Sequence, residues 1–167
     1  MVSTVSKQKL YPTRIDLPED LRAKVAGILN RTLAATLDLK TQTKQAHWNV
    51  KGMNFYQLHL LFDEMATELE EYTDMVAERI TALAGTAMGT ARTAAAESIL
   101  PEYTFEAVSG AEHVTVLADR YALYAKHVRE SIDATEELGD ADTADLYTEI
   151  SRTIDKRLWF LEAHIVV

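Results

Sequence analysis

The spacing of proline is the feature that most restricts what this chain can fold into. Among 167 residues, proline occurs only at Pro12, Pro18 and Pro101, and glycine occurs six times. Long stretches without these residues favour helices, because proline removes a backbone donor and clashes with the preceding turn. The chain is therefore predicted to consist mainly of long helices.

Apolar side chains recur at three- and four-residue spacing in four stretches, which predicts four amphipathic helices. The first begins near Pro18 and ends near Val50, and the second ends before Gly85. The third ends near Gly139, and the fourth follows it. The four apolar stripes are Leu21, Val25, Ile28, Leu29, Leu33 and Leu37; Leu58, Leu61, Phe62, Met65, Leu69, Tyr72, Val76, Ile80 and Leu83; Val114, Leu117, Tyr121, Tyr124, Val128 and Ile132; and Leu146, Ile150, Ile154, Leu158, Leu161 and Ile165.

Residues 85–109 form a long connector between the second and third helices, with a short helix predicted in its alanine-rich part at residues 93–98. A connector of this length joins parallel neighbours rather than forming a tight hairpin. Four long helices with one long crossover are typical of an all-α, ferritin-like four-helix bundle. We expect residues 18–167 to form this bundle and residues 1–17 to form a flexible N-terminal arm.

The composition limits the setting and the partners of the protein. The chain is 47% hydrophobic, carries a net charge of −9 and contains no cysteine. Without cysteine there are no disulfides and no thiolate metal sites, which points to a reducing cytoplasm. We see no secretory signal and no apolar run long enough to span a membrane. The acidic balance argues against a general nucleic-acid-binding surface.

Two histidines flank a predicted break between the first and second helices. His47 lies five residues before Gly52, which is a natural helix end, and His59 lies seven residues after it. Two antiparallel helices joined there would bring the histidines to the same level, close enough to share a metal ion. Asp63 lies one turn beyond His59 on the same face.

Two further acidic residues, Asp74 and Glu78, lie one turn apart on the second helix. Asp74 follows His59 by 15 residues, which is about 22 Å at the helical rise of 1.5 Å per residue. One metal ion therefore cannot bind both in a single chain. A shared site would need two chains related by a two-fold axis near residues 67–68.

Each of these residues also has an ordinary interpretation. A single histidine on a helix is more often a surface or core residue than a ligand, and acids near Arg79 could form simple ion pairs. Imidazole with carboxylate is nevertheless a ligand set suited to iron. No histidine follows a glutamate by three residues, so the usual ligand pair of a site inside one bundle is missing. The combination favours a metal site between subunits, and His113, His127 and His164 have no metal-like partners at helical spacing.

Several motifs occur together and cover nearly the whole chain after about residue 17. They are His47-Trp48-Asn49-Val50-Lys51-Gly52, Phe55, Leu58-His59, Phe62-Asp63, Asp74, Ala77-Glu78-Arg79-Ile80 and residues 140–145 and 155–162. In these motifs the chain resembles the Dps proteins, the mini-ferritins known as DNA-binding proteins from starved cells. Residues 83–87 depart from the family, because they lack its usual paired glycine and proline.

The resemblance implies a hollow homo-dodecamer with a ferroxidase centre at each two-fold interface. His47, His59 and Asp63 would come from one chain, and Asp74 and Glu78 from its partner. Members of the family oxidise Fe(II), preferably with hydrogen peroxide rather than dioxygen, and store Fe(III) oxide, which protects the cell from oxidative stress. Zinc or another divalent metal remains an alternative occupant, since geometry and availability set selectivity more than affinity does.

Trp48 and an acidic stretch are the remaining candidate site residues. Trp48 would be a stacking wall or radical sink beside the centre, or an ordinary core residue. The acidic residues near the fourth helix could simply cap it and interact with its dipole, at about 0.3–1 kcal/mol per charge. In the family the matching aspartates line an ion-entry pore at a three-fold axis. We expect Asp140 and Asp145 to face this pore, with Asp142 as a further candidate.

The alternative function is DNA compaction, with iron chemistry as a secondary activity. Some family members bind DNA through a lysine-rich N-terminal arm. Here the arm carries Lys7, Lys9 and Arg14 against Asp16, on a chain of net charge −9. Phosphate contacts need clustered cations and weaken with salt, so we expect weak or absent DNA binding. The expected location is the cytoplasm, with association with the nucleoid left open.

Overall fold

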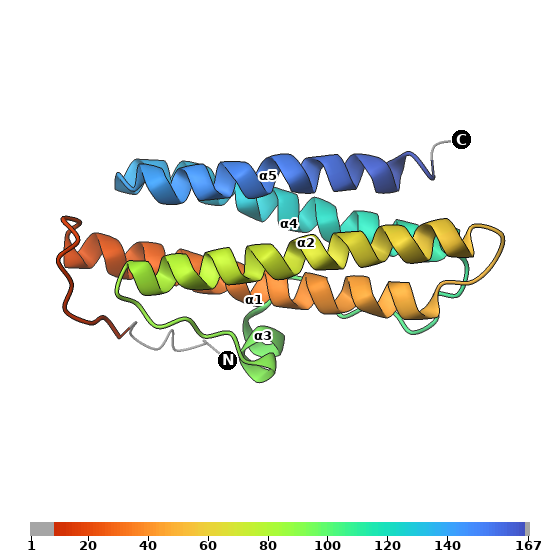
Figure 1. Cartoon of the computed structure of the whole chain (residues 1–167), viewed down its shortest axis with the longest axis horizontal. Helices are drawn as coiled ribbons and strands as arrows, with labels where there is room; N and C mark the ends of the chain where they lie inside the picture. The colour runs from red at the N-terminus through yellow and green to blue at the C-terminus, as the bar shows by residue number, and fades with distance from the viewer. Residues whose placement is uncertain (1–8, 166–167) are drawn as a thin grey trace.

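The computed structural model describes residues 9–165 and consists of four long helices and one short helix (Figure 1). The prediction of an all-α fold is confirmed, because these residues contain no strand beyond one isolated bridge between Lys51 and Ser109. The helices are α1 (Glu19–Asn49), α2 (Phe55–Ala82), α3 (Ala91–Glu97), α4 (Gly110–Leu138) and α5 (Ala141–Glu162).

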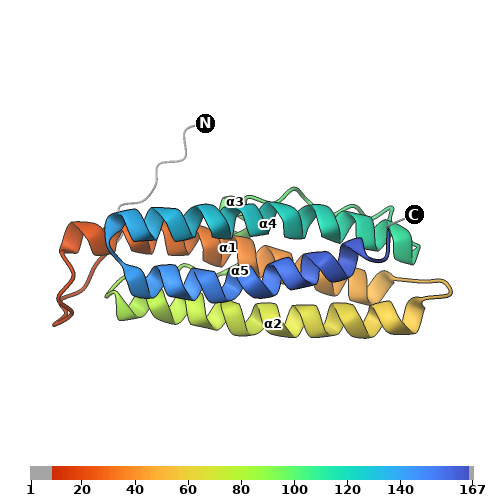
Figure 2. The same ribbon diagram turned by 90° about the horizontal axis from the view of Figure 1, so that it is seen from above.

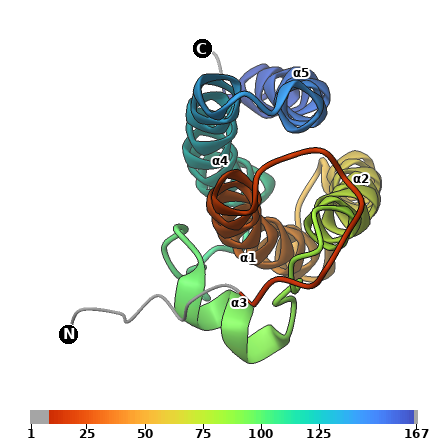
Figure 3. The same cartoon turned by 90° about the vertical axis from the view of Figure 1, so that its left-hand side faces the viewer.

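The four long helices form a bundle in which α1 packs on α2 and α4, and α5 packs on α4 and α2 (Figure 3). Figure 2 shows by its colours that α2 and α4 run in the same direction. The connector between them therefore returns along the bundle, as the sequence predicted. The short helix α3 lies outside the bundle against α1. None of the helices in residues 9–165 combines the length and apolar character needed to cross a membrane.

The connector follows α1 because polar side chains of that helix hold its backbone. The Asn30 amide donates to the Thr86 carbonyl at 3.0 Å and accepts from the Met88 amide at 2.8 Å. Farther along α1, the Gln42 amide donates to the Pro101 carbonyl at 3.0 Å. Backbone groups buried beneath a loop need such partners, so these side chains determine where the crossover runs.

The C-terminus of α2 closes without the glycine that this position usually carries. Ala84 adopts a left-handed conformation with φ of 62°, which costs an L-residue about 1–2 kcal/mol. The Gly85 amide donates to the Ile80 carbonyl and the Ala84 amide to the Thr81 carbonyl, each at 2.9 Å. These two bonds form a Schellman ending. The departure from the family pattern at residues 83–87 thus leaves the helix ending intact.

Residues 9–17 are anchored to the bundle rather than free, which differs from the predicted flexible arm. The Tyr11 amide donates to the Ala84 carbonyl at 2.8 Å, and Ile15 and Leu17 pack against the core. Arg22 bonds to the carbonyls of Leu17 and Leu83, each at 3.1 Å. Residues 1–8, with Lys7, lie outside the described part of the chain.

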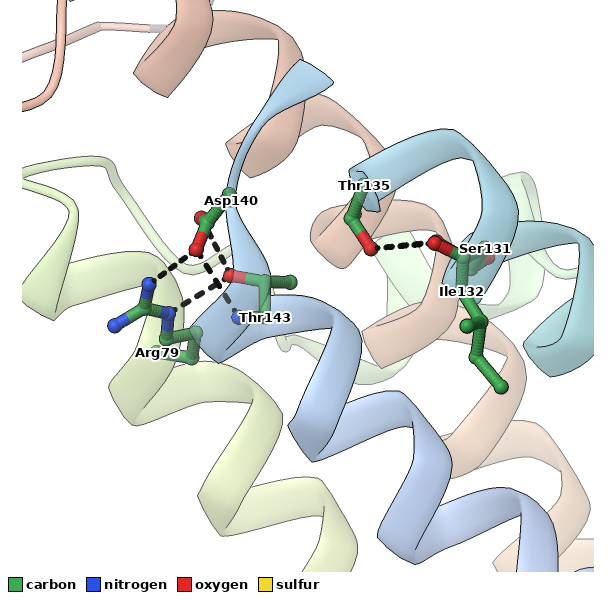
Figure 4. A network of polar contacts seen from close by, with 6 residues as sticks. All are labelled: Arg79, Ser131, Ile132, Thr135, Asp140 and Thr143. Atoms are coloured by element: carbon green, nitrogen blue, oxygen red, sulfur yellow. Dashed lines mark hydrogen bonds and ion pairs between the residues drawn. The ribbon is translucent and has the colours of Figure 1, made fainter. Parts of the chain in front are cut away.

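The start of α5 is tied to the end of α2 by a buried ion pair (Figure 4). The Asp140 carboxylate is 2% exposed and accepts from Nη2 of Arg79 at 2.8 Å. It also accepts from the Thr143 amide at 3.0 Å and the Thr143 hydroxyl at 2.6 Å, so it caps the helix. Gly139 makes the sharp turn before it possible, with φ of 88°. The end of α2 and the start of α5 are thereby joined through one carboxylate.

Replacing Asp140 should therefore destabilise the protein strongly. We expect Asp140→Ala to lower the free energy of unfolding by about 2–4 kcal/mol, because it uncaps α5 and leaves the mostly buried Arg79 unpaired. Chemical denaturation followed by circular dichroism measures the change. The matched control is Asp142→Ala, two residues on and exposed, which should stay within about 0.5 kcal/mol of the unaltered protein. Equal losses in both variants would contradict the structural role of Asp140.

Candidate metal centre

The turn between α1 and α2 brings the two predicted histidine ligands together. Gly52 takes a φ of 105° in this turn, which lets the chain reverse within a few residues. The Lys51 amide donates to the Val108 carbonyl at 3.1 Å, which fastens the turn to the start of α4. His47 and His59 thus lie at the same level of the bundle, as predicted.

The two imidazoles stack and hold each other's backbone. Their ring centroids are 3.8 Å apart with an interplanar angle of 18°. Nδ1 of His47 lies 2.7 Å from the His59 carbonyl, and Nδ1 of His59 lies 2.8 Å from the His47 carbonyl. A carbonyl only accepts, so each Nδ1 carries a proton, and in the neutral form of each ring the lone pair lies on Nε2. This is the arrangement that prepares a histidine to bind a metal ion.

Asp63 lies beside this pair but is engaged by a lysine. Its Oδ1 atom is 4.0 Å from Nε2 of His47 and 2.6 Å from Nζ of Lys44. The hydrogen bond from Lys44 lowers the pKa of Asp63 below its ordinary value, and the nearby imidazoles act in the same direction. The carboxylate therefore stays ionised at neutral pH, which is the form that binds a metal.

The second pair of predicted ligands is not brought to the histidines within one chain. Asp74 and Glu78 are exposed on α2, about 22 Å and about 28 Å along the helix from His59 by its rise. Within residues 9–165, no group of three or more histidine, aspartate or glutamate side chains is arranged to hold a metal ion. Within one chain the predicted ligands therefore lie in two separate groups, and their union across a two-fold axis remains a prediction.

Exposed apolar side chains lie beside the histidine pair. Trp48 is 66% exposed, so it is not a core residue of the single chain. Phe55, Tyr56 and Leu60 in the first turns of α2 are also exposed, and the Phe55 ring centroid is 5.1 Å from that of His59. Exposed apolar surface of this kind marks a contact with another molecule.

The three aspartates proposed for a pore differ in their surroundings. Asp140 is buried against Arg79 within the chain, so the capping interpretation describes it better than an open pore lining does. Asp142 and Asp145 are exposed in the first turn of α5 and just beyond it. They are the carboxylates that a symmetry axis could bring together.

Two polar contacts near the histidine pair were not predicted from the sequence. Lys44 lies three residues before His47, and that spacing was the available signal for its contact with Asp63. His113 was left without a partner, yet its Nδ1 lies 2.6 Å from the hydroxyl of Tyr103 in the connector. Burial lowers the pKa of His113, so the ring is neutral at neutral pH. No helical spacing could reveal this pair, because its members lie on different segments.

The ferritin-like domain matches residues 26–167. The DNA protection during starvation protein of Agrobacterium fabrum is 42% identical over 157 residues, covering 94% of this chain and 97% of that protein. Its counterpart from Brevibacillus brevis is 32% identical over 84% of this chain and 94% of its own length.

Solved structures agree with these sequence matches. Dps from Mycobacterium smegmatis is 29% identical with a TM-score of 0.90, covering 95% of this chain and 96% of that one. The Dps protein of Vibrio cholerae is described as a member of a broad superfamily of ferritin-like diiron-carboxylate proteins. It is 27% identical with a TM-score of 0.87, covering 95% and 99% of the two chains. The identity and coverage together show that this chain belongs to the Dps family of ferritin-like proteins.

Proposed function

We propose that this protein oxidises Fe(II) at centres formed between two subunits and stores the Fe(III) product inside a hollow assembly of twelve chains. The observation that carries the proposal is the mutual bonding of His47 and His59, which leaves an Nε2 lone pair on each ring. The preferred oxidant is hydrogen peroxide, with dioxygen as a slower substitute. Such a reaction in the cytoplasm would protect the cell from the oxidative stress that Fe(II) and hydrogen peroxide cause together.

The residues of the centre divide between two chains. His47, His59 and Asp63 of one chain would face Asp74 and Glu78 of its partner across an antiparallel α2 contact. Exposed apolar side chains beside the histidines support this, because they supply the surface that a second copy would cover. Trp48 would lie in that contact as a stacking wall.

Iron is the substrate in this proposal, and the ligand set suits it. Imidazole and carboxylate bind borderline divalent metals, and few protein ligands leave coordination positions open for an oxidant. Two Fe(II) ions give two electrons to one peroxide, producing two Fe(III) and two hydroxide ions without releasing a hydroxyl radical. Zinc fits the same ligands and would act as an inhibitor of the reaction.

A mixing experiment tests whether the centre spans two subunits. We expect His47→Ala/His59→Ala and Asp74→Ala/Glu78→Ala variants each to lose rapid peroxide-dependent iron oxidation. Unfolding and reassembling them together in equal amounts should restore about one quarter of the activity, because a random pairing leaves one centre in four intact. Stopped-flow absorbance of Fe(III) and iron co-eluting on gel filtration measure this.

The control for the mixing experiment is His164→Ala, which removes an exposed histidine near the C-terminus and should oxidise iron normally. Mixtures that stay inactive, although gel filtration shows full assembly, would show that the two groups of predicted ligands do not combine. Rapid oxidation by either variant alone would show that the residues replaced in that variant are not part of the centre.

We further propose that Asp145, with Asp142 beside it, guides Fe(II) into the assembly at a three-fold axis. A ring of carboxylates concentrates cations by its negative potential, and salt weakens that effect. Asp145→Asn should therefore slow iron uptake several-fold at low ionic strength and much less at high ionic strength. Glu102→Gln, which removes an exposed acid of the connector, is the control. Equal rates for Asp145→Asn and the unaltered protein would end the pore proposal.

DNA binding is the competing function, and the names of the relatives make it worth testing. The described part of the basic segment is short and anchored, and Lys9 lies over the Tyr11 ring at 5.0 Å. We expect a gel shift with duplex DNA to be weak at about 50 mM salt and lost at about 200 mM, because phosphate contacts fade steeply with salt. A shift that persists at the higher salt would favour DNA compaction.

A further inference from the structure

A row of buried tyrosines runs through the bundle, and each phenol meets a threonine of α1. The three tyrosines are Tyr121, Tyr124 and Tyr147, and each is at most 1% exposed. A buried hydroxyl needs a hydrogen-bond partner, and here threonines on one face of α1 supply it. The oxygen–oxygen distances are 3.4 Å for Thr43 with Tyr121, 2.6 Å for Thr36 with Tyr124 and 2.7 Å for Thr32 with Tyr147.

This row begins next to the candidate metal centre. Thr43 lies one turn before His47 on α1, so about 6 Å of helix separates them. From Thr43 the row continues to Thr36 about 10 Å away and then to Thr32 about 6 Å farther, by the same rise per residue. Tyr124 is close enough to Tyr121 on one side and to Tyr147 on the other to interact electrostatically with both.

One tyrosine of the row differs from the others because its chain of hydroxyls ends at a base. The Thr32 hydroxyl lies 2.7 Å from the Tyr147 hydroxyl and 2.9 Å from Nε2 of His127. All three threonine hydroxyls can also donate to a backbone carbonyl, at 3.2 Å from Thr32, 2.7 Å from Thr36 and 2.8 Å from Thr43, and the carbonyl contact of Thr32 is the longest. Only the Tyr147 chain, of these three, can deliver a proton to an ionisable group.

The protonation states of both ends suit a transfer from Tyr147 to His127. Burial raises the pKa of the Tyr147 phenol well above its ordinary value, so the phenol keeps its proton at neutral pH. Burial, with a smaller effect of Arg31, lowers the pKa of His127, so its ring is neutral and can accept a proton. His127 is only partly buried, so a proton received there can pass on to solvent.

A phenol that loses an electron becomes strongly acidic, and a buried cation is costly. An oxidised core tyrosine is therefore long-lived only where a proton acceptor lies nearby, so Tyr121 and Tyr124 can be oxidised only transiently. We propose that Tyr147 is a redox-active residue that gives up one electron, while its proton passes through the Thr32 hydroxyl to Nε2 of His127. Tyr124 and Tyr121 carry the electron toward the metal centre.

When a centre holds only one Fe(II), the electron from Tyr147 reduces the hydroxyl radical that forms there. One Fe(II) reduces hydrogen peroxide to hydroxide and a hydroxyl radical, and the radical needs one more electron. The electron from Tyr147 converts it to a second hydroxide, leaving Fe(III), a neutral tyrosyl radical and protonated His127. The formation of the hydroxyl radical that oxidises Tyr147 depends on the proposed iron oxidation. The proton relay from Tyr147 to His127 does not.

Electron paramagnetic resonance tests the proposal. Assembled protein loaded anaerobically with less than two Fe(II) per centre is mixed with hydrogen peroxide and frozen within seconds. We expect a tyrosyl signal that narrows when the tyrosine rings are deuterated and falls several-fold in Tyr147→Phe. Thr32→Val and His127→Phe should also lower it several-fold, because each interrupts the proton path.

Two matched variants control for general effects. Ser131→Ala removes the other hydroxyl that faces the Tyr147 phenol, and Tyr11→Phe removes an exposed tyrosine far from the core. Both should keep the full signal, and circular dichroism with gel filtration confirms folding of every variant. An unchanged signal in Tyr147→Phe, or in both Thr32→Val and His127→Phe, would overturn the relay.

A photochemical oxidant separates the relay from iron oxidation. Illuminated ruthenium tris-bipyridine with persulfate withdraws single electrons without iron, and it is applied to the unaltered protein and to Tyr147→Phe. A long-lived buried tyrosyl signal that Tyr147→Phe lacks supports the relay even if the protein fails to oxidise Fe(II). Identical signals in the two proteins would overturn the relay even if iron oxidation is rapid.

Discussion

Two hydrogen bonds between His47 and His59 are the contacts on which the candidate metal centre depends. Each imidazole donates from Nδ1 to the other residue's carbonyl, at 2.7 and 2.8 Å. These bonds hold the end of α1 and the start of α2 at one level, and they fix the tautomer of both rings. Both Nε2 lone pairs are thereby prepared for a metal ion before any ion arrives. The neighbouring carboxylate, Asp63, stays ionised because Lys44 donates to it.

The helical rise then explains why one chain cannot bring all the predicted ligands together. A straight helix carries Asp74 about 22 Å and Glu78 about 28 Å from His59, and no turn intervenes to bring them back. The aromatic and aliphatic side chains beside the histidines are left exposed by the same geometry. In the proposed function, a second copy of the chain packed against α2 would complete the ligand set and cover these side chains. The proposed function therefore depends on assembly rather than on the isolated fold.

Polar groups inside this bundle are accepted where they are paired. Asn30 and Gln42 hold the crossover, and Asp140 joins the start of α5 to Arg79 of α2. Tyr121, Tyr124 and Tyr147 of the core follow the same rule, because each of their phenols meets a threonine of α1. At Thr32 the pairing goes further, since its hydroxyl also reaches His127. A requirement of packing thus produces the proton path on which the proposed tyrosine oxidation rests.

The sequence by itself determined the helices, the parallel crossover and the position of the two histidines. These depend on local periodicity, on glycine and proline, and on fixed distances along a helix, all of which can be read from the order of residues. Tertiary structure alone decided that Asp140 is buried, that Trp48 is exposed and that residues 9–17 are anchored. It also decided the partners of Lys44, His113 and His127. These outcomes depend on contacts between segments far apart in the chain, where burial and hydrogen bonding are set by the neighbour that packing supplies.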